Sequence, residues 1–531
     1  MSFPGRGVLL FRPIKAAGRS GFVSATVQSI ITHGVTGTVI DIECSLSNNL
    51  PNIIIVGFAN KAVDEAKERI RGAFADSNIQ LPRKRITVNL APADLPKADS
   101  GFDLAIAASI LLSSEQIPPM PVAKQAFIGE LGLDGSTRAV RGIIGKILSG
   151  RSKGINYFYI PEDNLEQASL IPDITIVPIK NLLQLYNHLC KTKPITVINT
   201  SDSKIAVQSI YPDTYDGQQL SEVVGQAQAK RALEIAAAGG HNVFFTGPPG
   251  TGKSMLAKSL PSLLPCLNRE EILEVTHIHS LASHNYEKLI DRRPFRTPHH
   301  SASHIAVIGG GLQLRPGEIS LAHRGVLFFD ELPEFGRQTL EALRQPLEDR
   351  VISVARAKDT AEYPANFILV ATANPCPCGY YGTSGTCRCM PSQIIRYRQK
   401  LSGPILDRID LYSNVHEIKH SKLLTQPEDK TSDDNVRLRI AQARSIQNTR
   451  YAKSNKLNTD MTNSDIKKFA KIEPEAQELL NTAAERLNVS ARSYMRSIKV
   501  ARTIADLEKS PNITHAHISE ALAYRRPTQE D

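Results

Sequence analysis

Residues 242–257 of this 531-residue chain read NVFFTGPPGTGKSMLA: an apolar run, a Gly/Pro-rich turn and the start of a helical pattern. Residues 247–254 match the spacing G-x-x-x-x-G-K-[ST] in the strand–turn–helix context that gives this pattern its meaning. Glycines let the backbone approach a phosphate, backbone N–H groups point at its oxygens, and the helix N-terminus adds partial positive charge. The stretch therefore predicts a phosphate-binding loop in an α/β domain.

Two side chains of this loop have predicted roles. Lys253 reaches the β- and γ-phosphates, and the Ser254 hydroxyl ligates magnesium. A chance turn is a much weaker explanation. The predicted nucleotide-binding residues of the loop are Gly247, Pro248, Pro249, Gly250, Thr251, Gly252, Lys253 and Ser254.

Two further apolar runs end in polar residues. Residues 325–335 (GVLFFDELPEF) place Asp330 at a strand end, where it can hold Mg²⁺ through water, and Glu331 can polarise the attacking water. Residues 367–375 (FILVATANP) end near Asn374, which can bond the γ-phosphate or the water, because parallel strand ends share one crevice. An acidic pair after a strand can also be a helix N-cap. Together with the loop, these residues predict hydrolysis of ATP with Mg²⁺.

Bulk properties set wider bounds. The net charge of +10 mildly favours an acidic partner such as nucleic acid. No apolar run approaches the roughly 18–20 residues needed to cross a bilayer, so we expect no membrane partner. The basic first 22 residues carry too short an apolar run for a secretory signal, which predicts a cytoplasmic location.

Periodicity and composition divide the chain into five regions. An N-terminal extension (1–22) precedes an α+β domain (23–195), and a polar linker (196–218) follows. The nucleotide-binding α/β core spans 219–415, and an all-helical domain spans 416–531.

Long stretches resemble one protein family. RPFRTPHHSAS (293–303), LSGPILDRIDL (401–411) and SARSYMRSIKVARTIADL (490–507) are similar to the ComM/YifB family, a magnesium-chelatase-like branch of the AAA+ ATPases. So is GEISLAHRGVLFFDELPEF (317–335), and the N-terminal half matches the same family. The resemblance implies a non-proteolytic Lon-like domain, an AAA+ parallel-sheet core and a helical lid.

The resemblance also implies roles for two arginines. Arg408 resembles the arginine finger, which acts on the ATP of a neighbouring subunit, and Arg492 resembles the second sensor, which touches the γ-phosphate. A finger acting in trans implies a ring, which in this family is a hexamer. A surface salt bridge is the alternative for each arginine.

Four of the seven cysteines fall within residues 376–389 as C-x-C-x8-C-x-C. A disulfide framework is disfavoured by their odd number and by a reducing compartment. Zinc suits four soft ligands, and here it would stiffen the loop. An iron–sulfur cluster and four free thiols remain alternatives. The candidate zinc ligands are Cys376, Cys378, Cys387 and Cys389.

Two segments are candidate DNA contacts. Residues 349–367 read as a hairpin, and in the resembled branch such a hairpin faces the ring channel. Arg356 and Lys358 near its tip would contact phosphates without regard to sequence. The segment 275–324 is longer than a helix and a strand require and is also basic. Solvated surface charge is the alternative for any one of these residues.

A protease activity is not expected from the Lon-like half. That chemistry needs a Ser nucleophile within reach of a Lys base. In an ungapped comparison the two positions fall on Gly101 and Ile144, with Ser100 one place early and Lys146 two places late. A one-residue offset turns a side chain away from its partner.

Three functions are therefore compared. The first is a ring-forming ATP-driven motor on branched or single-stranded DNA, of the kind that the ComM family uses for branch migration in recombination or natural transformation. The second is a chelatase-type motor or chaperone subunit that acts on a protein or tetrapyrrole-pathway client. The third, an ATP-dependent protease, is disfavoured by the missing dyad.

Overall fold

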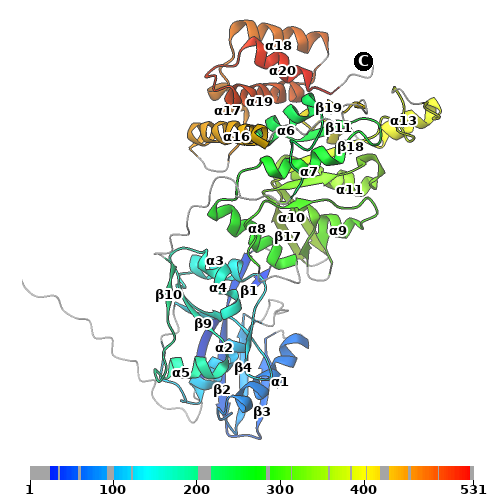
Figure 1. Cartoon of the computed structure of the whole chain (residues 1–531). Helices are drawn as coiled ribbons and strands as arrows, with labels where there is room; N and C mark the ends of the chain where they lie inside the picture. The colour runs from blue at the N-terminus through cyan, green and yellow to red at the C-terminus, as the bar shows by residue number, and fades with distance from the viewer. Residues whose placement is uncertain are drawn as a thin grey trace, which may run out of the picture.

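The computed structural model describes residues 24–33, 36–57, 61–92, 101–120, 124–200, 217–282, 288–311, 314–356, 359–382, 386–401, 403–418, 430–452, 456–487 and 489–526. Figure 1 shows three bodies in succession: an N-terminal α+β domain at one end, a parallel-sheet core in the middle and a helical domain at the other end. The α/β core and helical C-terminal region predicted from the sequence are confirmed.

The N-terminal domain holds two four-stranded sheets. One has the order β1-β2-β4-β3 and the other β10-β9-β8-β5. Helix α2 (Asp103–Ser113) packs against the first sheet and is buried along nearly its whole length, which explains its continuous apolar sequence. The first sheet comprises β1 (Ser24–His33), β2 (Thr36–Ser47), β4 (Arg85–Ala91) and β3 (Asn52–Val56), and the second β10 (Ile198–Asn199), β9 (Thr175–Ile179), β8 (Tyr157–Pro161) and β5 (Gln125–Phe127).

The predicted linker needs one correction. Its residues Ile198–Asn199 form β10, which pairs antiparallel with β9, and the Thr200 hydroxyl donates to the Ile174 carbonyl at 3.1 Å. The N-terminal domain therefore extends to residue 200, beyond the predicted boundary at 195. A two-residue edge strand leaves no periodic signal in a sequence. Residues 201–216 lie outside the described part.

The core sheet has five strands, whose pairings are all parallel, in the order β12-β15-β18-β11-β19. Its inner strands are buried on both faces, so they read as unbroken apolar runs instead of alternating ones. Helices α6 (Ala227–Gly239) and α7 (Lys253–Leu263) cover one face. The strands are β12 (Phe295–Arg296), β15 (Val326–Phe329), β18 (Ile368–Ala373), β11 (Val243–Thr246) and β19 (Leu411–Asn414).

Two hairpins leave the core side by side. One joins β13 (Gly309–Gly310) to β14 (Arg315–Pro316), and the other joins β16 (Val351–Arg356) to β17 (Asp359–Pro364). The Tyr363 hydroxyl donates to the Leu314 carbonyl and so ties the two together. The second hairpin is the one predicted for residues 349–367.

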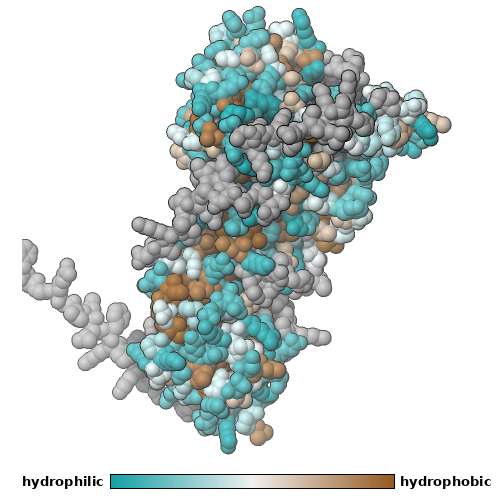
Figure 2. All heavy atoms as spheres, in the orientation of Figure 1, coloured by the Kyte–Doolittle hydropathy of each residue, from teal (hydrophilic) through white to brown (hydrophobic). Residues whose placement is uncertain are grey.

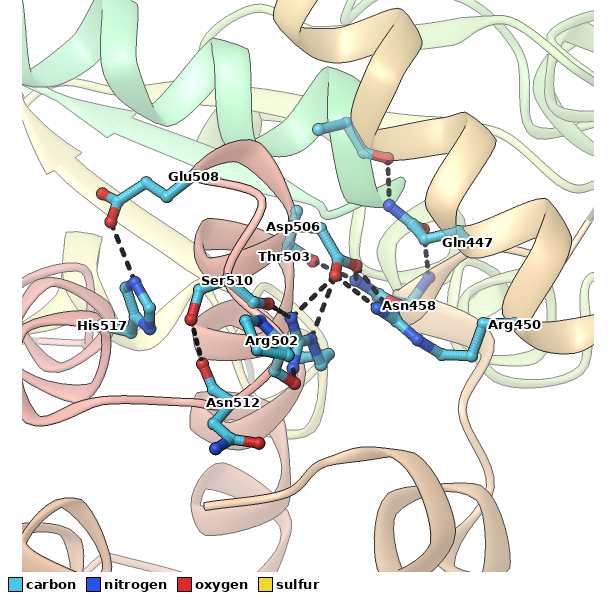
Figure 3. A network of polar contacts seen from close by, with 12 residues as sticks. Gln447, Arg450, Asn458, Arg502, Thr503, Asp506, Glu508, Ser510, Asn512 and His517 are labelled. Carbon is cyan, nitrogen blue, oxygen red and sulfur yellow. Dashed lines mark hydrogen bonds and ion pairs between the residues drawn. The ribbon is translucent and has the colours of Figure 1, made fainter. Parts of the chain in front are cut away.

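The helical domain is held by a buried polar network around Asp506 (Figure 3). The Asp506 carboxylate accepts from Arg450 at 2.8 Å, Asn458 at 2.8 Å and Arg502 at 2.9 Å. These residues tie α16 (Lys430–Tyr451) to α19 (Ala491–Leu507) and fix the direction of α19, which starts at the functional edge described below. The other helices are α17 (Asn463–Phe469), α18 (Pro474–Arg486) and α20 (His515–Ala523).

Helix α8 (Arg269–Ala282) joins the core to the N-terminal domain. It packs on α3 (Ile143–Ser152), and the Arg269 side chain donates to the Leu170 carbonyl at 2.8 Å. A small buried cluster made of Leu170, Leu267, Ile272 and Val275 closes the contact. Figure 2 shows hydrophobic surface around this junction, while hydrophilic surface covers most of the remaining visible face. Across the described residues, no helix is both long enough and apolar enough to cross a membrane.

Candidate functional site

The predicted phosphate loop follows β11 directly and ends in α7. Gly250 and Gly252 have φ values of +78° and +89°, a region that favours glycine. At Gly247 a Cβ atom would lie 2.2 Å from the Val415 carbonyl oxygen, so a larger residue has no room. The sequence pattern is therefore matched by a backbone that only glycines can adopt at these points.

Lys253 is the first residue of α7 and is buried at the mouth of the loop. Its ammonium group donates to the carbonyls of Gly247 and Pro248, both at 2.7 Å, and to Asn374 Oδ1 at 3.1 Å. Burial lowers the pKa of Lys253, while the carboxylates of Asp330 and Glu331 oppose this shift. The lysine is thus held where the loop and the third predicted strand end meet.

Asp330 lies at the carboxyl end of β15, as predicted, and faces the start of α7. Its carboxylate accepts hydrogen bonds from the Ser254 hydroxyl at 3.0 Å and from the Thr372 hydroxyl at 2.6 Å. A hydroxyl beside a carboxylate is the oxygen-rich donor set that Mg²⁺ prefers, so Ser254 and Asp330 fit the predicted metal role. Thr372 was not predicted. The sequence feature that could have identified Thr372 is its position two residues before Asn374, which places both side chains on the same face of the strand.

Glu331 occupies a sharp turn after β15. Its φ of +53° is uncommon for a residue with a side chain, and its backbone N–H donates to the Thr372 hydroxyl at 2.9 Å. Asn374 Nδ2 approaches Glu331 Oε1 at 3.5 Å. The structure therefore brings Lys253, Ser254, Asp330, Glu331 and Asn374 together at the carboxyl edge of the sheet.

The two predicted arginines lie at the opposite edge. Arg408 precedes β19, and its carbonyl accepts from Asn242, the residue before β11, at 3.0 Å. The Arg408 side chain forms an ion pair with Glu348. Arg492, in the first turn of α19, forms an ion pair with the other oxygen of the same carboxylate. Both arginines hold the pKa of Glu348 below its usual value, with Arg408 as the larger cause.

A cavity of about 660 Å³ opens beside this group. Its other lining residues include the cations Arg350, Arg496 and Lys499. Helix α19 is anchored there because Arg496 donates to the Ile409 carbonyl at 2.6 Å. The cavity is also lined by the acidic residues Asp407, Asp410 and Asp460. Arg408 and Arg492 meet around Glu348 at the amino edge of the sheet, and we call this group the arginine patch.

Arg492 lies away from the phosphate loop of its own chain. Contact with the γ-phosphate bound there would place Arg492 beside Lys253. Instead it lies beside Arg408, across a four-residue strand that spans about 13 Å. The physical reason is that α19 packs against the amino edge through Arg496, which carries its first turn away from the phosphate loop.

The four predicted metal ligands also come together. The sulfur atoms of Cys376, Cys378, Cys387 and Cys389 all lie within 4.8 Å of one another. All four are free thiols, and Cys376 is buried. Backbone N–H groups of Tyr380 and Arg388 lower the pKa of the Cys378 thiol to about 6, whereas desolvation and the neighbouring sulfurs raise the pKa of Cys387 and Cys389. This cluster can hold a metal ion, and it is the single group of its kind among the residues that the structure describes.

The structure describes only some of the residues predicted to contact DNA. Lys358 and the side chain of Arg356 fall outside the described residues. Three arginines of the basic segment 275–324 are held inside the chain: Arg293 pairs with Glu271, Arg296 with Glu318 and Arg324 with Glu274. These three arginines serve to hold the segment, so they are poor candidates for phosphate contacts.

In the Lon-like half, the lysine nearest the expected catalytic position is engaged inside the domain. Lys146 is buried on α3 and donates to the Ile30 carbonyl at 3.1 Å, and Ile144 lies in the core. The Gly101 carbonyl accepts from Gly129 at 3.0 Å. Ser100 lies outside the described residues. The lysine is therefore engaged in the core of the domain.

Comparison with known proteins shows which family the chain resembles. Family models described as "Magnesium chelatase, subunit ChlI", "Subunit ChlI of Mg-chelatase" and "Magnesium chelatase, subunit ChlI C-terminal" match residues 219–423, 42–164 and 430–525. The chain is 41% identical over 507 residues to the competence protein ComM of Haemophilus influenzae, covering 94% of this chain and 97% of that protein. It is also 41% identical over 499 residues to YifB of Escherichia coli, covering 93% and 95%. A Lon protease of Mycoplasmopsis agalactiae is 24% identical over 193 residues, 34% of this chain and 19% of that protein.

Proposed function

Because the chain belongs to the ComM/YifB family of magnesium-chelatase-like AAA+ proteins, we propose that it is an ATP-driven motor that assembles into a hexameric ring and moves branched DNA. The observation that carries this proposal is the arginine patch. Arg408 and Arg492 converge on Glu348 at the edge of the sheet opposite Lys253, so the ATP they serve is that of a neighbouring subunit. A surface that must meet the phosphate loop of the next copy produces a ring when the rotation closes.

In this mechanism the carboxyl edge binds and orients ATP. The backbone of residues 247–254 and the Lys253 ammonium group bind the phosphates, and Ser254 and Asp330 hold Mg²⁺. When bound, Mg²⁺ neutralises charge that develops on the phosphate oxygens. Glu331 accepts a proton from the attacking water, and Asn374 orients that water or the γ-phosphate. Lys253 moves from the loop carbonyls to the phosphate oxygens, which are stronger acceptors.

The neighbouring subunit completes the site. Arg408 and Arg492 stabilise the negative charge of the transferring phosphoryl group. Arginine fingers increase the rate of such reactions about 10³–10⁵-fold. Until then Glu348 holds both guanidinium groups. The phosphate therefore competes with a carboxylate for the same two cations.

A DNA client is supported by charge and by the hairpins. The chain has a net charge of +10, and the two hairpins β13–β14 and β16–β17 lie together. In the sequence, Arg356 and Lys358 fall near the turn between β16 and β17. A relative 41% identical is described as a competence protein, and the resemblance to the ComM family implies a role on DNA. Branch migration is the activity that fits a ring on joined DNA strands.

Zinc belongs to the same proposal as a structural cofactor. Four thiolates are soft ligands, and zinc takes four of them in a closed tetrahedral site without redox chemistry.

The test measures phosphate release by the full chain with no DNA, linear duplex, single strand and a four-way junction, with Lys253→Ala as the blank. We expect the junction to give the largest stimulation and the blank to give none. If none of the DNAs binds or changes the rate, the DNA motor is wrong.

A second candidate is favoured by the description of the matching family models, a magnesium chelatase subunit. A chelatase-type motor acts on a protein or tetrapyrrole-pathway client. Rate stimulation by such a client, with no response to DNA, would favour this alternative.

A further inference from the structure

The cysteine cluster has the dimensions of a tetrahedral thiolate site. Cys376 Sγ lies 3.3 Å from Cys378 Sγ and 3.7 Å from Cys387 Sγ, and the last two sulfurs are 3.6 Å apart. A tetrahedral zinc with bonds of about 2.3 Å sets its sulfurs about 3.8 Å apart. The Tyr381 backbone N–H donates to Cys376 Sγ at 3.3 Å, a contact that stabilises a thiolate ligand. Geometry therefore favours an ion over four unrelated thiols.

The loop that bears the cysteines touches the nucleotide site at two points. At its start, Cys376 comes two residues after Asn374, which accepts from Lys253 and approaches Glu331. Further along, Gly379 packs against Pro249 of the phosphate loop so closely that a Cβ atom at residue 379 would lie 2.6 Å from Pro249 Cδ. One short loop therefore contacts both the third strand end and the phosphate loop.

The outer side of the loop is backed by α13 (Pro391–Gln399), which follows Cys389. The Arg398 guanidinium lies 5.3 Å from the centre of the Tyr381 ring, and Lys400 pairs with Glu334 at 3.1 Å. These contacts are exposed and each contributes little stability. Of the four cysteines only Cys376 is buried, so apolar packing alone does not hold this loop. An ion bound by the four sulfurs would add a further constraint, as it does in small metal-held modules.

We infer that zinc held by Cys376, Cys378, Cys387 and Cys389 clamps the strand end that carries Asn374 against the phosphate loop at Pro249. The clamp makes the rate of ATP hydrolysis depend on metal occupancy, while leaving the phosphate-binding backbone intact. The rate effect rests on the proposed ATPase function. The metal assignment rests on the cysteine geometry alone, so the two can fail separately.

The first experiment measures metal. The full chain is purified with thiols reduced, zinc and iron are measured by mass spectrometry, and cobalt is substituted to detect the thiolate-to-Co²⁺ charge-transfer band. We expect one zinc per chain and the band, both lost in Cys378→Ser and kept in Cys190→Ser, a free cysteine of the N-terminal domain. Iron in place of zinc, or no metal and no cobalt band, would overturn the assignment.

The second experiment measures the coupling. We expect Cys378→Ser to lower kcat of basal ATP hydrolysis about tenfold, the effect of losing a supporting metal contact, with ATP affinity changed by less than about threefold. Circular dichroism shows whether the variant is folded. Loss of zinc at unchanged kcat would contradict the clamp.

A glycine pair tests the clamp without touching a thiol. Gly379→Ala puts a methyl group into Pro249, whereas Gly382→Ala has a similar positive φ, +72° against +88°, and no atom within 4 Å. We expect Gly379→Ala to keep its zinc and lose activity, and Gly382→Ala to keep both. Equal activity of the two variants would overturn the inference. A wild-type chain that holds zinc but hydrolyses no ATP would refute the proposed function and leave the zinc site standing.

Discussion

The carboxyl and amino edges of the core sheet differ in the partners that their charged side chains have within one chain. At the carboxyl edge, Lys253, Asp330, Glu331 and Asn374 already contact one another or the loop within one chain. At the amino edge, Arg408 and Arg492 are paired with Glu348, a carboxylate that takes no part in the chemistry of phosphate. In the proposed function, the carboxyl edge binds the nucleotide of its own chain, and the arginines of the amino edge act on the nucleotide of a neighbouring subunit.

This difference separates binding from hydrolysis. In the proposed function, a single chain supplies the groups that bind ATP, but Arg408 and Arg492 lie at the other end of strands such as the four-residue β11, which spans about 13 Å. The proposal therefore predicts that hydrolysis requires assembly and that ATP binding does not.

Removing the central cation of either edge should nearly abolish activity. We expect Arg408→Ala and Lys253→Ala each to lower kcat at least about 100-fold. Lys253→Ala should also weaken ATP binding because, of these two residues, only Lys253 lies in the phosphate loop of its own chain. Phosphate release and fluorescent-nucleotide binding measure the two effects. Lys258→Ala, an exposed lysine on the same helix, is the matched control and should behave as wild type.

Mixing those two inactive variants should restore activity. In a randomly mixed ring, an intact site forms where an Arg408→Ala chain supplies the phosphate loop and its Lys253→Ala neighbour supplies Arg408. We expect about one quarter of the wild-type rate from a 1:1 mixture, since one of four neighbour arrangements is productive. A mixture that stays inactive would show that Arg408 does not act across the interface.

Arg492 should matter less than Arg408 and through the same patch. We expect Arg492→Ala to lower kcat about tenfold and the double variant to lose less than the product of the two single losses, because both arginines share one phosphate and one carboxylate. Arg486→Ala, on the neighbouring helix α18, serves as a control. Strictly multiplicative losses would mean that the two arginines act independently.

Neutralising Glu348 should have the smallest and opposite effect. Glu348→Gln removes a partly exposed competitor whose ion pairs contribute about 0.2–1 kcal/mol. We expect ATP-dependent ring assembly, followed by sedimentation, to need up to about fivefold less ATP. Glu341→Gln, which breaks only the pair with Arg344, should change nothing. Weaker assembly of Glu348→Gln would mean that the carboxylate positions the arginines productively.

Most of the carboxyl edge could be predicted because its residues follow strands in contiguous motifs. Strand, turn and side chain lie within a few residues, so spacing alone places Lys253, Asp330 and Asn374. The arginine patch could not be predicted in this way. Its contacts join Glu348 to residues 60 and 144 positions away, and the partner carboxylate has no local signal.

Parts of the fold followed the same rule. The apolar β18 was predicted because it forms a nearly unbroken apolar run. Strand β10 was assigned to a linker because its two residues pair only through tertiary contact. The direction of α19 depends on buried Asp506 and on Arg496, and no periodicity contains that information.

The position of Glu348 has a consequence for timing. It lies at the end of α12 (Arg344–Asp349), three residues before β16 begins, so the carboxylate that holds the arginines is also the base of a hairpin. If the proposed role of the arginines holds, ATP that draws Arg408 and Arg492 away would break the ion pairs beside the hairpin of the subunit that donates the arginines, not of the subunit that binds the nucleotide. Nucleotide binding in one subunit would then change the charge balance next to a hairpin of its neighbour.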